Sequence, residues 1–156
     1  EALTRMNAAL GLDLADDRFL TAAYLILDLP AGEIRMAGAG HHPILLLLPG
    51  GGVREIQGDG LPLGILPEGD FTEIRLPVDP GSHLVFFTDG LVEAESPDGR
   101  LYGTDRIHAV LAAAADECDP SPERIIDLLL SSVREWTRGK PLADDLTLLV
   151  VRLKTG

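Results

Sequence analysis

The stretches Phe86-Phe87-Thr88-Asp89-Gly90 and Ala143-Asp144-Asp145-Leu146-Thr147 decide the fold of this chain, because each places acidic residues at one end of a predicted strand. The apolar run Leu84–Phe87 predicts a strand buried in a sheet, which must stop at the turn that Gly90 allows. The run Leu146–Leu153 predicts a second strand, with the acidic pair at its entrance. If the two strands are antiparallel neighbours, the acidic residues of both stretches lie together at one edge of a sheet.

Carboxylates gathered at such an edge predict a metal site. Acidic residues without histidine or thiol partners are the ligand set of a hard cation such as Mg²⁺ or Mn²⁺. Asp89 also has a plainer interpretation, because an aspartate before glycine often caps its own turn. Between Asp144 and Asp145 the spacing alone does not choose.

Four segments resemble, in the same order, those of the SpoIIE-like bacterial branch of the metal-dependent PPM-type serine/threonine phosphatases. Ala39-Gly40-His41-His42-Pro43 is similar to the family's A-G-H-x-P motif, and Gly60-Leu61-Pro62-Leu63-Gly64 is similar to its G-L-P-L-G motif. Thr88-Asp89-Gly90-Leu91-Val92-Glu93-Ala94 is similar to the motif T-D-G-[LV]-x-E-A, and Asp144-Asp145-Leu146-Thr147 is similar to D-D-x-T. One such motif is weak, but four in the family's order argue against a chance match. Gly38 departs from the pattern, since the family usually has asparagine there.

The resemblance spans essentially the whole chain and implies its fold. We expect an α+β domain of the PPM type, a layered β-sandwich flanked by helices, with residues 1–156 forming a single SpoIIE-like phosphatase domain. The family's N-terminal strands carry G-D-x-x-D and G-D-x-x-G-x-G segments with further metal-binding aspartates, and neither segment is present in this sequence. The resemblance therefore implies the C-terminal portion of the domain, incomplete at its N-terminus.

The resemblance also implies an activity, a cofactor and a partner. It implies a metal-dependent protein phosphatase acting on phosphoserine or phosphothreonine of a bacterial regulatory protein such as an anti-sigma-factor antagonist. Two Mn²⁺ or Mg²⁺ ions are expected in the complete domain, with Asp89 and Asp144 as metal ligands, while Asp145 holds its loop by hydrogen bonds to the backbone. No side-chain nucleophile or other cofactor site is expected, and this chain alone is expected to be inactive.

A rival hypothesis is a non-catalytic phosphatase-fold module that binds a partner regulator. Retention of Asp89 and Asp144 argues against it, because a module without chemistry has no need of acids at both places. The resemblance leaves open whether the protein forms a dimer.

Composition narrows the class of protein. Hydrophobic residues make up 46% and charged residues 24% of the chain, which is ordinary for a soluble globular domain. The formal net charge of −12 argues against a nucleic-acid or anionic-membrane surface. No apolar stretch approaches the roughly 18 residues that predict a membrane span. The single cysteine, Cys118, fits a reducing compartment, so the cytoplasm is expected.

Periodicity predicts further elements and a few local roles. A helix is predicted over residues 1–10, and strands are predicted over residues 19–29, 33–37, 44–48, 53–56 and 71–76. Two more helices are predicted, one from Asp105 with Thr104 as its N-cap and one from Pro122 with Ser121 as its N-cap. The second of these helices is predicted to stop at Gly139. His41 and His42 suit a hydrogen-bonded turn or an acid–base role, Trp136 suits core packing, and the glycine-rich loop Gly58–Asp70 is expected to be mobile.

Overall fold

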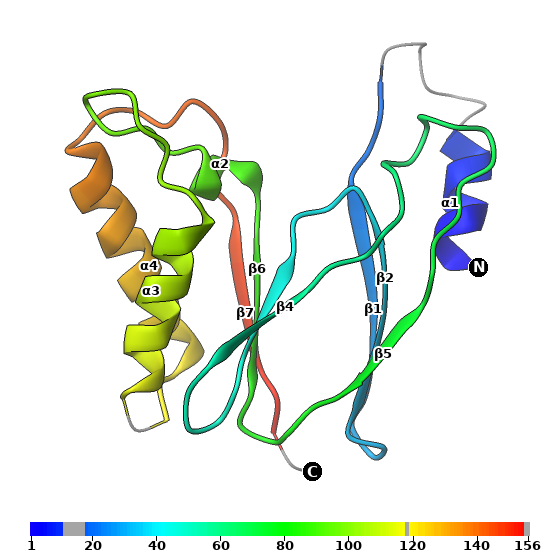
Figure 1. Cartoon of the computed structure of the whole chain (residues 1–156), viewed down its shortest axis with the longest axis horizontal. Coiled ribbons are helices and arrows are strands. Elements are labelled where there is room, and N and C mark those ends of the chain that lie inside the picture. Colours follow the sequence, from blue (N-terminus) through cyan, green and yellow to red (C-terminus); the bar gives the residue numbers. More distant parts are fainter. Residues whose placement is uncertain (11–17, 118, 155–156) are drawn as a thin grey trace. The chain divides into compact units, whose positions relative to one another are not determined.

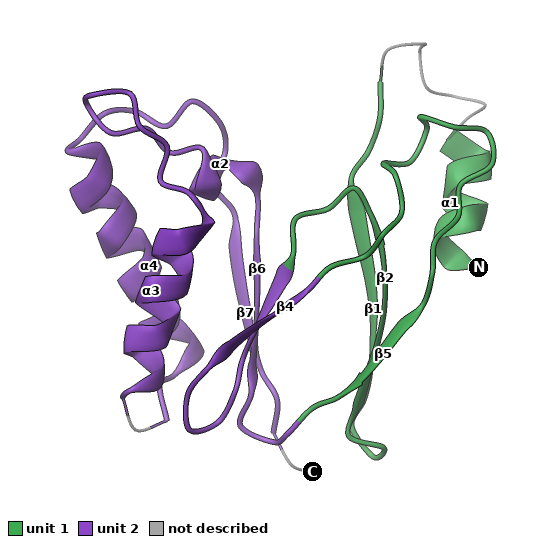
Figure 2. Cartoon of the chain, in the orientation of Figure 1, with its two compact units in different colours: residues 1–43, 57–78, 156 green, residues 44–56, 79–155 purple. Residues whose placement is uncertain are grey.

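The computed structural model of the protein describes residues 1–10, 18–117 and 119–154. The chain forms two compact units, shown in different colours in Figure 2. Unit 1 comprises residues 1–43 and 57–78, and unit 2 comprises residues 44–56 and 79–155. The elements follow the chain in the order α1 (Ala2–Leu10), β1 (Ala22–Asp28), β2 (Glu33–Ala39), β3 (Ile44–Leu47), β4 (Val53–Ile56), β5 (Ile74–Pro77), β6 (His83–Phe87), α2 (Asp89–Val92), α3 (Thr104–Ala115), α4 (Pro122–Thr137) and β7 (Leu148–Arg152) (Figure 1).

Unit 1 is a three-stranded antiparallel sheet, in the order β1-β2-β5, with α1 against it. Side chains on β2 alternate between the two faces, and Ile34 and Met36 are fully buried. On the opposite face Arg35 stands directly across from Arg75 of β5. Two like charges in register repel each other, so this face needs acids between them.

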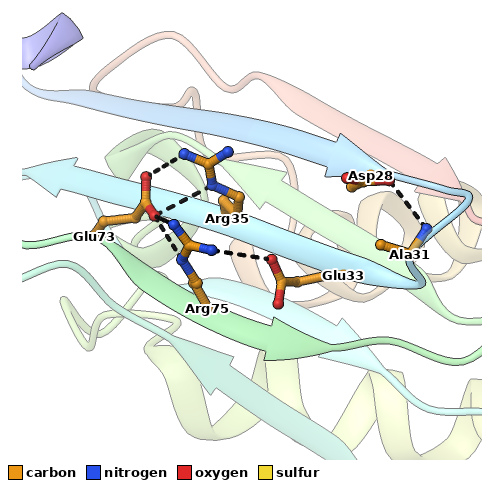
Figure 3. Close-up of polar contacts among 6 residues, drawn as sticks. All are labelled: Asp28, Ala31, Glu33, Arg35, Glu73 and Arg75. Atoms are coloured by element: carbon orange, nitrogen blue, oxygen red, sulfur yellow. Dashed lines mark hydrogen bonds and ion pairs between the residues drawn. The ribbon is translucent and has the colours of Figure 1, made fainter.

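Glu73 supplies that neutralising charge (Figure 3). Its carboxylate accepts from the guanidinium of Arg35 at 2.8 Å and lies 2.7 Å from that of Arg75. The hydrogen bond from Arg35 lowers the pKa of Glu73 below its ordinary value. Because these side chains are solvent-exposed, the ion pairs offset the repulsion between the two arginines but add little to the free energy of unfolding.

The loop between β4 and β5 is held against α1, which argues against the mobility expected from its glycines. Asn7 of α1 is 3% exposed; its amide donates to the carbonyl oxygens of Leu66 and Pro67 at 2.9 and 3.2 Å, and its Oδ1 accepts from the Gly64 N–H at 2.8 Å. Leu63 is fully buried and exchanges two backbone hydrogen bonds with Leu20.

Unit 2 is a four-stranded antiparallel sheet, in the order β4-β3-β6-β7, whose core is covered by α3 and α4. All four residues of β3 are buried, as its continuous apolar run predicts. One face of α4 is buried, through Ile125, Leu129 and Val133. Two antiparallel sheets with helices confirm the α+β class.

The helix ends confirm one predicted cap and correct another. Ser121 caps α4 and accepts from the Arg124 N–H at 3.2 Å. Thr104, however, is already the first residue of α3, and Gly103 is the N-cap with a φ of 76°. At the other end of α4, Arg138 adopts a left-handed φ of 50° and Gly139 follows at 85°, which ends the helix as predicted. Among the described residues, no helix has the length and apolar character needed to cross a membrane.

Candidate functional site

The two acidic stretches meet at one edge of the four-stranded sheet in unit 2. Strands β6 and β7 pair antiparallel, with Phe87 opposite Leu148 and Val85 opposite Val150. Asp89 follows the end of β6 and Asp144 precedes the start of β7, so the pairing brings the two segments to the same edge. The predicted antiparallel pairing of these two strands is confirmed.

Thr88 joins the two segments beyond the last pair of the strands. Its backbone N–H donates to the Thr147 carbonyl at 3.2 Å. Its hydroxyl donates to the Asp145 carbonyl at 2.9 Å and accepts from the Thr147 N–H at 2.9 Å. The residue immediately before Asp89 is therefore fastened to the second residue of the acidic pair and to Thr147 beyond it. Sequence reasoning gave Thr88 no role, although a hydroxyl at a strand end was a visible signal for backbone bonding.

Gly90 lies against the same loop from the other side of Asp89. A Cβ at this position would stand 2.5 Å from the carbonyl oxygen of Asp145 and 3.1 Å from that of Asp144. The expected reason for this glycine, a tight turn, is wrong. Its φ is not in the left-handed region, and it is the close approach of the two main chains that excludes a side chain.

The carboxylates of Asp89 and Asp144 are both exposed at this edge. Oδ1 of Asp89, the first residue of α2, accepts from the Gly90 N–H at 3.1 Å. Oδ1 of Asp144 accepts from the Asp145 N–H at 2.7 Å. Each carboxylate is thus oriented by the backbone N–H that follows it. The bond at Asp89 is also what a turn-capping aspartate makes, so both interpretations of this residue agree with the geometry.

Asp145 holds its loop differently from the expectation. We expected its side chain to bond the backbone, yet the hydrogen bonds of the described residues place the side-chain acceptor on Asp144. Asp145 contributes its main chain, since its carbonyl accepts from Thr88 and its N–H donates to Asp144.

A second set of contacts links the segment after Asp89 to the segment before Asp144. The indole Nε1–H of Trp136 donates to the Arg100 carbonyl at 3.2 Å, and the Arg106 guanidinium lies 3.7 Å from the centre of the indole ring. Lys140 forms an ion pair with Glu95. Trp136 does pack against the core as predicted, and it also has these polar and cationic contacts.

The histidine candidates His41 and His42 lie in unit 1, between β2 and β3. Nδ1 of His41 lies 2.8 Å from the carbonyl oxygen of His42, which agrees with the structural interpretation of this segment. Within the described ranges, no three His, Cys, Asp or Glu side chains lie together as metal ligands. The oxygen donors of Asp89 and Asp144 still fit a hard cation, because Mg²⁺ commonly keeps several waters and uses one or two carboxylates.

The family model for Stage II sporulation protein E (SpoIIE) matches residues 1–154. The chain belongs to the SpoIIE family. Among curated relatives, it is 28% identical over 133 residues to Protein IcfG of Synechocystis sp., covering 85% of this chain and 20% of that protein. It is 24% identical over 155 residues to Phosphoserine phosphatase RsbU of Bacillus subtilis, covering 99% of this chain and 45% of RsbU. The chain thus spans from a fifth to less than half of these relatives.

Solved structures share its fold. The PP2C phosphatase domain of SpoIIE from Bacillus subtilis, determined with a fragment of its regulatory domain, superposes with a TM-score of 0.81 at 26% identity, covering 99% of this chain and 44% of that one. A structure of the phosphatase domain described as presoaked in Mn has a TM-score of 0.72 at 24% identity, covering 99% and 65%. The fold of this SpoIIE-family chain is therefore that of the PP2C phosphatase domains, as the sequence motifs predicted.

Proposed function

We propose that this chain, over residues 1–156, is the C-terminal portion of a single metal-dependent phosphatase domain that hydrolyses phosphoserine or phosphothreonine in a protein. The observation that carries the proposal is the contact of Thr88 and Gly90 with the main chain of Asp144 and Asp145. This contact fastens together two segments that each present an exposed carboxylate at one strand edge, in a chain of the SpoIIE family.

The metal in this proposal is Mn²⁺ or Mg²⁺, held by Asp89 and Asp144 together with water. Two ions are proposed for the complete domain. Such ions bind phosphoryl oxygens and lower the pKa of a bound water, chemistry that carboxylates alone do not supply. The protein's own contribution is to hold both carboxylates in place. Each carboxylate accepts a hydrogen bond from the backbone N–H of the residue after it.

The substrate in this proposal is a phosphorylated regulatory protein of the anti-sigma-factor antagonist type, and the location is the cytoplasm. The relative RsbU is named a phosphoserine phosphatase, which supports a phosphoserine substrate. The net charge of −12 supports a protein partner over nucleic acid.

A non-catalytic module that binds a partner regulator is the second candidate. One observation favours it: among the described residues, no three His, Cys, Asp or Glu side chains lie close enough together to bind a metal ion. The two functions differ in a direct assay.

The test is phosphate release from a phosphoserine-containing regulatory protein, measured with the full-length protein that the gene encodes. We expect release that depends on added Mn²⁺ or Mg²⁺ and stops when a chelator removes the metal. Tight binding of the phosphoprotein without any release at saturating metal would support the binding module and contradict the phosphatase.

A further inference from the structure

Unit 1 contains a hollow of about 260 Å³ between α1 and the loop that joins β4 to β5. Its lining is apolar and acidic, with Leu61 and Leu66 beside Asp59, Glu68 and Asp70. We propose that this hollow docks a basic, amphipathic segment of a partner protein. The docking is independent of the phosphatase activity proposed for unit 2.

The apolar part of this surface is unusually exposed. In the lining of the hollow, Leu61 is 55% and Leu66 is 49% exposed. Ile65, the residue before Leu66, is 48% exposed, and Met6, the residue before Asn7 of the lining, is 49% exposed. Single exposed leucines are ordinary, but several large apolar side chains around one hollow are typical of an interaction site. Covering them would remove apolar area from water, which is the main favourable term in protein association.

The loop that presents these leucines is already held in place. The buried side chain of Asn7 bonds the loop at Gly64, Leu66 and Pro67, and Leu63 anchors it by packing beneath. A partner that binds here does not have to order the loop first. Preorganisation of this kind lowers the entropic cost of association.

The charges select the chemistry of the partner. The hollow is lined by three carboxylates and by no lysine or arginine. Among the described residues, no cation lies within salt-bridge distance of Asp59, Glu68 or Asp70, in contrast to Glu73, which has two arginines nearby. Lysine or arginine side chains next to apolar ones satisfy both parts of the surface, whereas nucleic acids and anionic membranes are repelled.

A library of random displayed peptides, selected against the immobilised chain, is the probe for this site. We expect the enriched peptides to combine Lys or Arg with Leu, Ile or Phe. Enrichment of acidic peptides, of peptides without cations, or of none above the background would overturn the proposal.

Variants then locate the binding. Replacing Leu61→Ser and Leu66→Ser together is expected to weaken the best peptide at least about tenfold, which corresponds to roughly 1.4 kcal/mol. The matched control is Leu101→Ser with Leu149→Ser in unit 2, where the side chains are 52% and 54% exposed, and its affinity should stay within about twofold of the unaltered chain. An equal loss in both double variants would contradict docking at the hollow.

A second pair of variants separates specific docking from attraction to an acidic protein. The hollow loses its charge in Asp59→Asn, Glu68→Gln and Asp70→Asn combined. The same number of charges is removed from α3 and α4, all at exposed positions, by the control Asp105→Asn, Asp127→Asn and Glu135→Gln. Only the first set should weaken binding several-fold. Equal weakening in both sets would mean that the net charge alone attracts the peptide.

Discussion

Thr88 is the residue whose side chain fastens the two acidic stretches to each other. Thr88→Val keeps the shape but removes the hydroxyl that bonds Asp145 and Thr147. Because Asp145 and Thr147 are exposed, water replaces part of what is lost, and we expect the free energy of unfolding to fall by about 1 kcal/mol.

Urea denaturation measures this change, and Thr88→Ser is the control, since it retains the hydroxyl. Stability of Thr88→Val equal to that of the unaltered chain would show that the two hydrogen bonds do not hold the loop.

We expect His83 to make the free energy of unfolding depend on pH. It is 2% exposed at the start of β6, and burial, helped by the nearby Arg152, lowers its pKa below the ordinary value; Asp119 and a hydrogen bond to the Pro120 carbonyl oppose this shift. The unfolded chain therefore takes up the proton first as the pH falls through about 6.5. We expect the free energy of unfolding to decrease across that range and to level off below the folded-state pKa.

Urea denaturation between about pH 8 and about pH 5 tests this behaviour. In His83→Gln the slope near pH 6.5 should disappear, whereas in His108→Gln, whose side chain is 33% exposed in the native protein, it should remain. A slope that persists in His83→Gln would assign the pH dependence to another group.

At the scale of residues, the sequence predicted which acids meet but not what holds them together. Antiparallel strands were enough to bring Asp89 and Asp144 to one edge. The roles of Thr88 and Gly90 depend on the distance between two main chains more than fifty residues apart, as in the Thr88–Asp145 bond. Local periodicity contains no information about such a distance, and Gly90 was consequently explained by the wrong cause.

At the scale of elements, the helix caps show where sequence patterns succeed. Ser121 precedes Pro122 in an extended conformation, and this combination is legible in the sequence. Thr104 has the right chemistry, but the chain enters α3 through Gly103 with a positive φ, which a sequence does not display. A residue with a side-chain hydroxyl can therefore be the N-cap of a helix, as Ser121 is, or the first helical residue one position later, as Thr104 is.

Ser121→Ala tests the confirmed cap. It removes the oxygen that accepts from the Arg124 N–H, and we expect a loss of about 1 kcal/mol in the free energy of unfolding. Ser131→Ala, at an exposed position inside α4, is the control and should be neutral or slightly stabilising. Thermal or urea denaturation gives both values. An equal effect of the two substitutions would contradict the capping role.

Three strands begin later than predicted, and packing explains one of them. β5 begins at Ile74 rather than Phe71, because the Phe71 ring lies against the backbone of Gly60 and Gly69, where a Cβ would meet it at 2.4 and 2.5 Å. β1 begins at Ala22 rather than Phe19, and β7 begins at Leu148 rather than Leu146. A large aromatic side chain favours a strand by propensity, but here its ring contacts loop glycines that are distant in sequence.

At the scale of the whole molecule, the chain presents two carboxylates for the proposed metal site. A site with two acids lacks ligands that would offset the dehydration of the ion. We expect Mn²⁺ titrated into this chain to bind weakly or not at all by calorimetry. Sub-micromolar binding that depends on Asp89 would show that these ligands suffice on their own.

The most direct test of the central claim compares three aspartate variants in one assay. Phosphate release from a phosphorylated regulatory protein is measured in saturating Mn²⁺ with the longest gene product, and urea denaturation serves as the folding control. We predict that Asp89→Asn and Asp144→Asn each abolish release while the fold persists, because the amide removes the charge that binds the metal. Asp145→Asn should be milder, because this residue acts through its main chain. Full activity of Asp89→Asn or Asp144→Asn would contradict the metal assignment, and an inactive Asp145→Asn beside an active Asp144→Asn would transfer the ligand role to Asp145.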